Sequence, residues 1–217
     1  MSRLFVRSSS ELIYSSAVLT AVPFTFACWF NVNYTQNFLM TLAHYEGGST
    51  GDFWVLSAES TPDIRASIYR SGVGSASAIS TSGYSENVWH HACGVFAASN
   101  DRRVYVDGGS KGTNSTDRSP DSTVTATAIG GLRRSDNPVV YTDGSIAEAA
   151  IWNATLTDEE VAVLATGIRP IFVRPQSLVM YLPLIRDNDE DLIGGLSFNV
   201  VNTPTISAHA PIIYGGL

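Results

Sequence analysis

The 217-residue sequence has few charged residues and no long apolar run. Charged residues make up 15% of the chain and hydrophobic residues 44%, a composition that excludes a disordered polyampholyte and suits a protein with two packed sheet faces. No segment approaches the roughly 18 consecutive apolar residues that a membrane-spanning helix needs. Polar residues interrupt residues 1–14 before an apolar signal-peptide region of about seven residues can form. We therefore expect neither a secretion signal nor a membrane anchor.

Positive charge is also scarce. The formal net charge is −7 and the calculated isoelectric point is about 4.9. A phosphate backbone requires a basic surface, so this balance argues against nucleic acid as a partner. The two arginine pairs, Arg102–Arg103 and Arg133–Arg134, are too small to form such a surface. We expect them to be solvated residues of turns or strand edges.

The motifs of several enzyme classes are missing. The sequence has no Glu-x-Asp-x-x-Glu pattern of the β-glucanases, no His-Glu-x-x-His, no Cys-x-x-Cys and no phosphate-binding loop ending in Gly-Lys-Ser/Thr. The acidic run at residues 187–191 is flanked by turn residues, which favours a solvated loop over a catalytic acid pair. We predict a non-enzyme with no catalytic residues.

Short alternating segments separated by glycine-rich turns dominate the sequence. This pattern predicts an all-β fold, a two-sheet antiparallel β-sandwich. Residues 24–31 carry apolar side chains on both faces, as a central strand does. The expected strands are residues 24–31, 38–44, 52–58, 64–69, 76–81, 89–98, 102–107, 123–129, 145–152, 178–184 and 196–201.

One short helix is expected near residues 158–166. Thr157 and Glu160 have the spacing of a capping box, and Val161, Leu164, Ala165 and Ile168 form one apolar stripe. Gly167 and Pro170 then end the helix. We expect it to pack on the sandwich.

Three ordered segments resemble one family. Trp89-His-His leads into a strand, the next strand ends in Tyr105-Val-Asp-Gly108, and residues 144–168 run from a Gly-containing strand through Trp152 to the short helix. Together with residues 24–30 these segments resemble the laminin G-like, concanavalin A-like jelly rolls, to which the pentraxins are related. The resemblance implies one domain over residues 1–217 with a short tail at 208–217. It also implies that residues 178–184 return to pair beside the first strand.

The resemblance bears on the two cysteines. A disulfide joins the corresponding strands in pentraxins, and Cys93 follows His91 as in that pattern. Cys28 falls one residue later than the family position, which turns its side chain to the other sheet face. A pair of buried thiols and a disulfide both remain open.

Calcium binding occurs in many laminin G-like and pentraxin domains, so acidic loops are the candidate sites. We predict no cofactor, with calcium as the open alternative. His90 and His91 are adjacent on a strand and point to opposite faces, so they cannot chelate one ion together. The candidate calcium ligands are Asp136, Asn137 and Asp143 in one loop, and Asp187, Asp189 and Asp191 in another.

A lectin-like fold raises the question of glycan binding, which needs exposed aromatic rings beside planar polar groups. Aromatic residues in strands also serve as core, so both roles stay open for each candidate. The candidate ligand-binding residues are Tyr45, Trp54, Tyr69, Tyr84 and Tyr141.

Two hypotheses for the function of the protein remain. The end of the chain, His209 to Tyr214, resembles tails that follow such domains in bacteriophage proteins. The first hypothesis is therefore a non-enzymatic virion protein, made in the host cytoplasm, that serves as a capsid decoration, head-fibre or tail-associated subunit. It would bind other virion proteins, copies of itself and a cell-surface glycan through edge strands and the tail. The alternative is a free carbohydrate-binding lectin, with or without calcium dependence.

Overall fold

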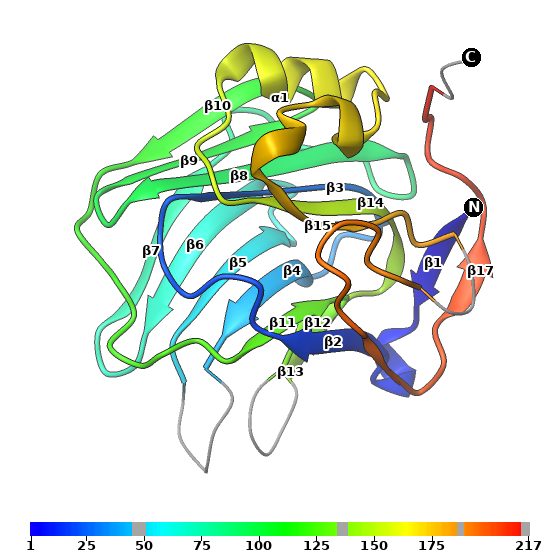
Figure 1. The fold of residues 1–217 in the computed structure, drawn as a ribbon, viewed down its shortest axis with the longest axis horizontal. Helices are drawn as coiled ribbons and strands as arrows, with labels where there is room; N and C mark the ends of the chain where they lie inside the picture. The colour runs from blue at the N-terminus through cyan, green and yellow to red at the C-terminus, as the bar shows by residue number, and fades with distance from the viewer. Residues whose placement is uncertain (45–50, 134–138, 186–188, 214–217) are drawn as a thin grey trace.

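The computed structural model describes residues 1–44, 51–133, 139–185 and 189–213. Figure 1 shows two sheets stacked face to face, with the single α-helix lying across the outside of one of them. Every strand pairing is antiparallel. The predicted all-β sandwich is confirmed. None of the helices in the described ranges has the length and apolar character to cross a membrane.

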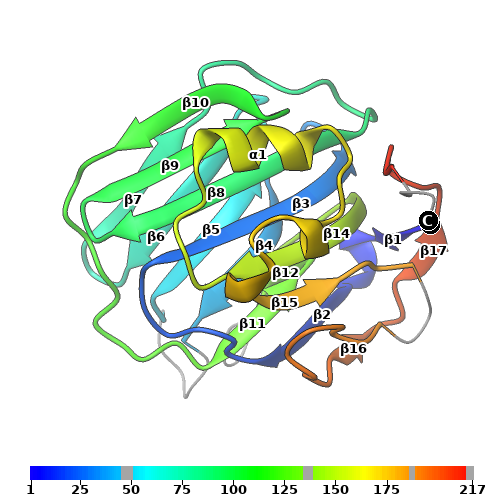
Figure 2. The same cartoon turned by 45° about the horizontal axis from the view of Figure 1, so that its top comes forward.

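The first sheet has eight strands, in the order β10-β9-β8-β3-β14-β1-β17, with β15 also paired to β14. Figure 2 shows the middle strands of this sheet beneath the helix. Its strands are β1 (Ser2–Phe5), β3 (Phe24–Val32), β8 (His90–Ala98), β9 (Asp101–Val106), β10 (Gly109–Asn114), β14 (Gly144–Trp152), β15 (Leu178–Leu182) and β17 (Thr205–Ser207).

The second sheet has seven strands, in the order β16-β2-β11-β4-β5-β6-β7. A small hairpin of β12 (Gly131–Leu132) and β13 (Val139–Tyr141) accompanies it. The seven strands are β2 (Leu12–Ser16), β4 (Asn37–Ala43), β5 (Phe53–Ala58), β6 (Ile64–Arg70), β7 (Gly74–Ile79), β11 (Ala126–Ile129) and β16 (Asn199–Val201).

The main core fills the space between the sheets, and strand alternation explains its composition. Phe24, Phe26 and Phe30 are fully buried on the inner face of β3. Trp54, Leu56 and Ala58 face them from β5, two residues apart as the strand period requires. The ring of Phe24 meets that of Trp54 edge-on, with centroids 5.3 Å apart.

The outer face of the first sheet carries a second core. The helix α1 (Asp158–Ala165) buries Val161 and Leu164 against β8, β9 and β14 side chains such as Trp152. Thr157 caps the helix as predicted, because its hydroxyl accepts the N–H of Glu160 while the Glu160 carboxylate accepts the N–H of Thr157. The helix prediction is confirmed.

The C-terminal segment is held against the sandwich where the structure describes it. Ala210 is buried against Trp29, with Ile212 packed on the same cluster. The N–H of Ile213 donates to the carbonyl of Gly167 over 2.9 Å. Residues 208–213 therefore pack on the sandwich through Ala210 and Ile212, and the contacts of this tail with other molecules stay a prediction.

Two expectations are wrong. Strand β15 pairs with β14 through residues 149–152, whereas β1 pairs with β14 through residues 144–146. The returning strand therefore lies beyond the end of β1 and does not pair with it. Arg102 was expected to be solvated, but it is 1% exposed, because its guanidinium reaches inward to oxygens of three neighbouring residues.

The two cysteines lie on neighbouring central strands and face different cores. Cys28 faces the main core and Cys93 the core beneath α1, and both thiols are free. Their strands are neighbours, but Cys28 lies opposite Ala92 and Cys93 opposite Ala27. The one-residue offset thus turns the two side chains to opposite faces and rules out a disulfide between them.

His91 makes stability depend on pH. It is 2% exposed and meets the Trp29 ring edge-on, and its Nδ1 has no hydrogen-bond partner among the described residues. Burial lowers the pKa of His91 to about 4, although the charge of Asp107 opposes the shift. The unfolded chain, with an ordinary pKa of about 6.5, binds the proton more tightly, so stability falls as pH drops from about 6.5 toward 4.

We expect this effect to reach about 2 kcal/mol of unfolding free energy at about pH 5. Urea denaturation at pH 7 and pH 5 should show a smaller loss of stability in His91→Gln than in the parent chain. His44→Gln, at a half-buried position, serves as the control and should lose as much as the parent chain. Equal losses in all three proteins would show that His91 is not the titrating group.

Candidate functional site

Trp54, one of the predicted ligand-binding aromatic residues, lines the wall of a cavity. The cavity has a volume of about 330 Å³ and lies at one end of the sandwich. We call it the Trp54 groove. Its lining residues are Thr20, Ala21 and Val22 from the β2–β3 connection, Trp54 from β5, and Ser119, Pro120, Asp121, Ser122 and Thr123 from the β10–β11 connection.

Trp54 is held rigidly at this site. Its side chain points inward from β5, is 4% exposed and packs edge-on against Phe24 in the main core. Because so little of the ring is exposed, Trp54 contributes to the groove as a fixed part of the wall. Both roles left open by the sequence therefore apply to Trp54, which is part of the core and also lines the groove.

A buried carboxylate shapes the rim of the groove. Asp52, 1% exposed, accepts the backbone N–H groups of Ser71 (2.8 Å), Asp121 (2.5 Å) and Ser122 (3.0 Å). Burial opposes ionisation, but these three donors and the nearby Arg70 together lower the pKa of Asp52. The anionic carboxylate thus ties the β10–β11 connection to the start of β5. Sequence reasoning missed Asp52, because its partners lie up to 70 residues away.

Two further contacts fix the same loop. Arg70, at the end of β6, forms an ion pair with the carboxylate of Asp121. On the other side, the Nδ1 of His44 lies 2.6 Å from the carbonyl oxygen of Thr123. The exposed side chains of Thr20, Ser119 and Thr123 and the half-buried Ser122 surround the opening. The groove therefore has a rim of hydroxyl groups on a loop anchored at three points, with the largely buried Trp54 in its wall.

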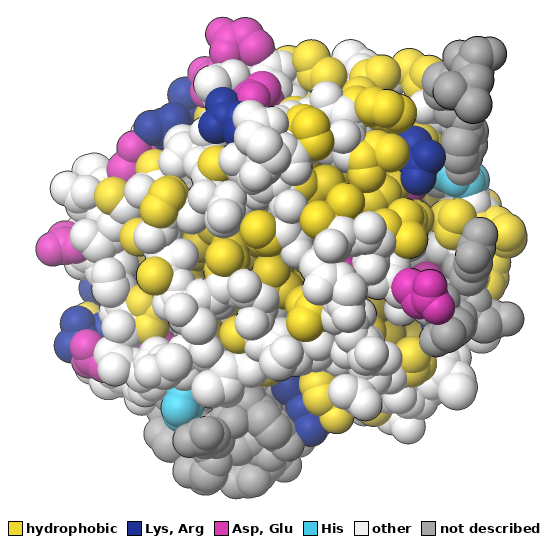
Figure 3. Space-filling view, in the orientation of Figure 1, with side chains coloured by type: hydrophobic (Ala, Val, Ile, Leu, Met, Phe, Trp, Pro, Cys, Tyr) yellow, Lys and Arg dark blue, Asp and Glu magenta, His cyan; other side chains and the backbone are white. Residues whose placement is uncertain are grey.

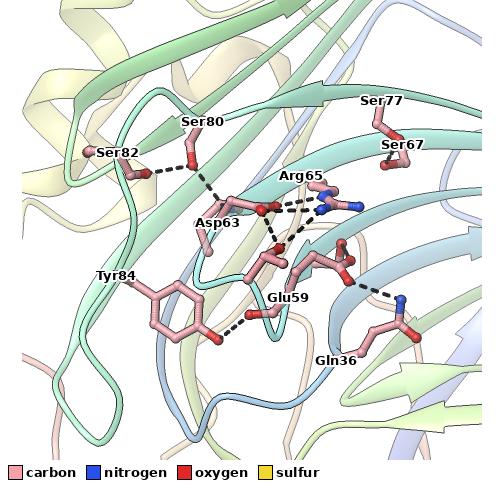
Figure 4. A network of polar contacts seen from close by, with 12 residues as sticks. Gln36, Glu59, Asp63, Arg65, Ser67, Ser77, Ser80, Ser82 and Tyr84 are labelled. Atoms are coloured by element: carbon pink, nitrogen blue, oxygen red, sulfur yellow. Dashed lines mark hydrogen bonds and ion pairs between the residues drawn. The ribbon is translucent and has the colours of Figure 1, made fainter.

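The other aromatic candidates have structural roles or lie elsewhere. Tyr84 is buried, and its hydroxyl donates to the carbonyl of Glu59 over 2.9 Å, as Figure 4 shows. Tyr69 stacks on Phe53 outside the second sheet, with ring centroids 5.0 Å apart. Tyr141 is half-buried in β13, and Tyr45 lies outside the described residues.

Figure 4 also shows a polar network on β5, β6 and β7. The Asp63 carboxylate binds the Arg65 guanidinium, Glu59 accepts from Gln36 over 3.1 Å, and Ser67 donates to Ser77 over 2.7 Å. These side chains are paired with one another, Asp63 with Arg65 at the start of β6 and Ser67 with Ser77 between β6 and β7. The network therefore stabilises the second sheet. Its serine hydroxyl groups are already hydrogen-bonded, whereas the hydroxyl side chains around the Trp54 groove are exposed or half-buried.

The carboxylates of the calcium candidates that the structure describes form hydrogen bonds or ion pairs with other protein groups. Asp143 accepts the side-chain N–H of Asn33 over 2.8 Å, and the neighbouring Asn37 oxygen accepts from the Arg7 guanidinium. The buried Asp189 carboxylate pairs with Arg3 at 2.6 Å. Asp136, Asn137 and Asp187 lie outside the described residues.

Asp191 is structural as well, and the expectation of a solvated acidic loop is wrong for it and for Asp189. The Asp191 carboxylate accepts the N–H groups of Tyr181 (2.9 Å), Ile193 (3.0 Å) and Gly194 (3.0 Å), which fixes the turn after β15. Across the described ranges, no group of three or more histidine, cysteine or acidic side chains is arranged to hold a metal ion.

The family follows from a comparison with protein-family models. Residues 7–162 match the model described as the concanavalin A-like lectin/glucanases superfamily. The chain belongs to this superfamily. The matched residues include Trp54 and both connections that line the groove. A comparison with curated proteins gave no match.

Several solved structures share the concanavalin A-like fold at low sequence identity. A carbohydrate-binding protein from Bacteroides ovatus has a TM-score of 0.63 and 17% identity, over 92% of this chain and 57% of that one. A heptameric SAP-like pentraxin from Limulus polyphemus has a TM-score of 0.61 and 14% identity, over 88% of each chain. The CBM40 module of the Ruminococcus gnavus IT-sialidase, bound to α2,3-sialyllactose, has a TM-score of 0.59 and 12% identity, over 67% of this chain and 84% of that one.

Proposed function

We propose that this concanavalin A-like domain is a non-enzymatic carbohydrate-binding protein whose ligand site is the Trp54 groove. The observation that carries the proposal is the combination of a rigid indole with hydroxyl side chains on an anchored loop. Sugars combine apolar C–H faces with many hydroxyl groups, which match an aromatic ring and polar rim groups respectively. The Bacteroides ovatus and Ruminococcus gnavus proteins, which share the fold, are described as carbohydrate-binding.

A groove-filling variant tests the proposal. Thr20 is exposed and lines the groove, so Thr20→Trp should occupy the cavity without disturbing the core. On a glycan array followed by calorimetry, we expect the parent chain to bind a set of glycans saturably, and Thr20→Trp to lose at least about tenfold in affinity, which corresponds to about 1.4 kcal/mol.

Thr113→Trp is the matched control, because Thr113 is exposed on β10 and does not line the groove. We expect it to bind as the parent chain does. Saturable binding that survives Thr20→Trp would place the glycan elsewhere on the domain, and an array without any binding would contradict the proposed function.

A small binding site gains overall affinity when several copies of the domain are joined in one assembly. One small groove supplies modest affinity, and joining several grooves in one assembly raises avidity without new contacts. The Limulus pentraxin is heptameric. We therefore propose that this chain also acts as a homo-oligomer.

The virion role stays a prediction. None of the similar proteins named above is described as a virion component. Mass spectrometry of purified particles from the source would test it, because a capsid decoration or fibre subunit is present in many copies per particle. Glycan binding is compatible with that location, since the sequence-based hypothesis included a cell-surface glycan.

A further inference from the structure

The Trp54 groove carries more negative than positive charge. The Asp121 side chain is 63% exposed on the rim, and its carboxylate pairs with Arg70. The Asp52 carboxylate lies directly behind the rim, where it holds the N–H groups of Asp121 and Ser122. One carboxylate is thus exposed on the rim and a second is buried behind it, and the nearby Arg70 guanidinium is engaged by Asp121.

The lining of the groove adds no positive charge. None of the residues that line the groove is lysine or arginine. The chain as a whole has a net charge of −7, and the face in Figure 3 shows scattered basic side chains without a continuous basic patch.

We propose that the Trp54 groove selects uncharged glycans and rejects anionic ones such as sialylated glycans, an inference that rests on the proposed function. A carboxylate entering the groove would lose hydration and meet two like charges, while Arg70 is already paired. Sugar hydroxyl groups carry no such cost, because the serine and threonine rim can both donate to them and accept from them. The specificity therefore differs from that of the Ruminococcus gnavus module, which binds sialyllactose.

The first experiment compares glycans that differ in one charge. Binding of the parent chain to each neutral glycan selected on the array is measured beside its sialylated form and the carboxamide of that form, at about pH 8, where a ligand carboxylate is ionised. We expect the neutral glycan and the carboxamide to bind at least about tenfold more tightly than the carboxylate, and the difference to shrink as salt is added.

Equal or tighter binding of the sialylated carboxylate would overturn this inference and leave the proposed function standing. An array on which no glycan binds would contradict the proposed function itself. A carboxamide that binds as weakly as the carboxylate would assign the rejection to bulk, and this too would overturn the inference.

A charge variant tests the same point from the protein side. Asp121→Asn removes the rim carboxylate and releases Arg70 from its ion pair. We expect the preference for neutral over sialylated glycans to fall by at least about fivefold, because Arg70 then becomes available to a ligand carboxylate. Glu159→Gln removes one exposed acid from α1, on the outer face of the other sheet, and should leave the preference unchanged. A preference that responds equally to both variants would reflect net charge alone and contradict the assignment to this groove.

Discussion

Gly112→Ala is expected to destabilise the domain by about 4 kcal/mol or to prevent folding. A Cβ atom at residue 112 would lie 1.7 Å from the carbonyl oxygen of Ile79 and 2.4 Å from its carbonyl carbon. Both are backbone atoms at the end of β7, so no side-chain rotation relieves the overlap. This contact joins β10 and β7, which are edge strands of different sheets. The substitution should therefore open one side of the sandwich.

Gly109→Ala provides the matched control on the same strand. A Cβ atom there meets no heavy atom within 4 Å, and the residue is exposed. We expect its unfolding free energy to stay within about 1 kcal/mol of the parent value. Chemical denaturation of both variants measures the difference. Equal stability of Gly112→Ala and Gly109→Ala would show that the close approach of β10 to β7 does not exist in solution.

Arg102→Met is expected to cost about 3 kcal/mol of unfolding free energy. The guanidinium is buried and donates to the Asn114 side chain and to the carbonyls of Ser99 and Thr116, the last over 2.9 Å. Burial and the nearby Arg118 lower the pKa of Arg102, so its hydrogen bonds offset a real desolvation cost. Methionine keeps an unbranched apolar side chain about as long as the aliphatic part of arginine, but it leaves three acceptors without their donor.

Arg103→Met changes the neighbouring residue on the opposite face. Arg103 forms a partly exposed ion pair with Asp101, a kind of interaction that contributes at most about 1 kcal/mol. We expect a loss of that size or less in a urea titration. If both arginine variants lost the same stability, the hydrogen bonds of Arg102 would not be what holds the end of this hairpin together.

The strands that were predicted correctly are those whose side chains alternate strongly. Residues 24–31 and 145–152 became β3 and β14, each within one residue at either end. Strands β1 and β2 were missed, since serine, arginine and glutamate interrupt their short apolar runs. Their positions depend on pairing with distant strands, β14 and β11, which local sequence does not show.

The groove was only partly predictable for the same reason. Trp54 could be singled out as an aromatic residue in a strand, but its place beside residues 119–123 follows from the folded arrangement. Asp52 gave no local signal, because the backbone groups that it binds come from two other connections. The prediction for Arg102 was wrong, because the sequence does not show that one of two adjacent arginines on a strand is buried.

The most direct test of the proposed glycan site is an NMR titration of the four tryptophan indole N–H signals with a glycan selected on the array. The proposal predicts a saturable shift of the Trp54 signal, with no comparable shift for Trp152, which is fully buried beneath α1. Saturation of the protein with the glycan while the Trp54 signal stays in place would contradict the assignment of this groove as the carbohydrate site.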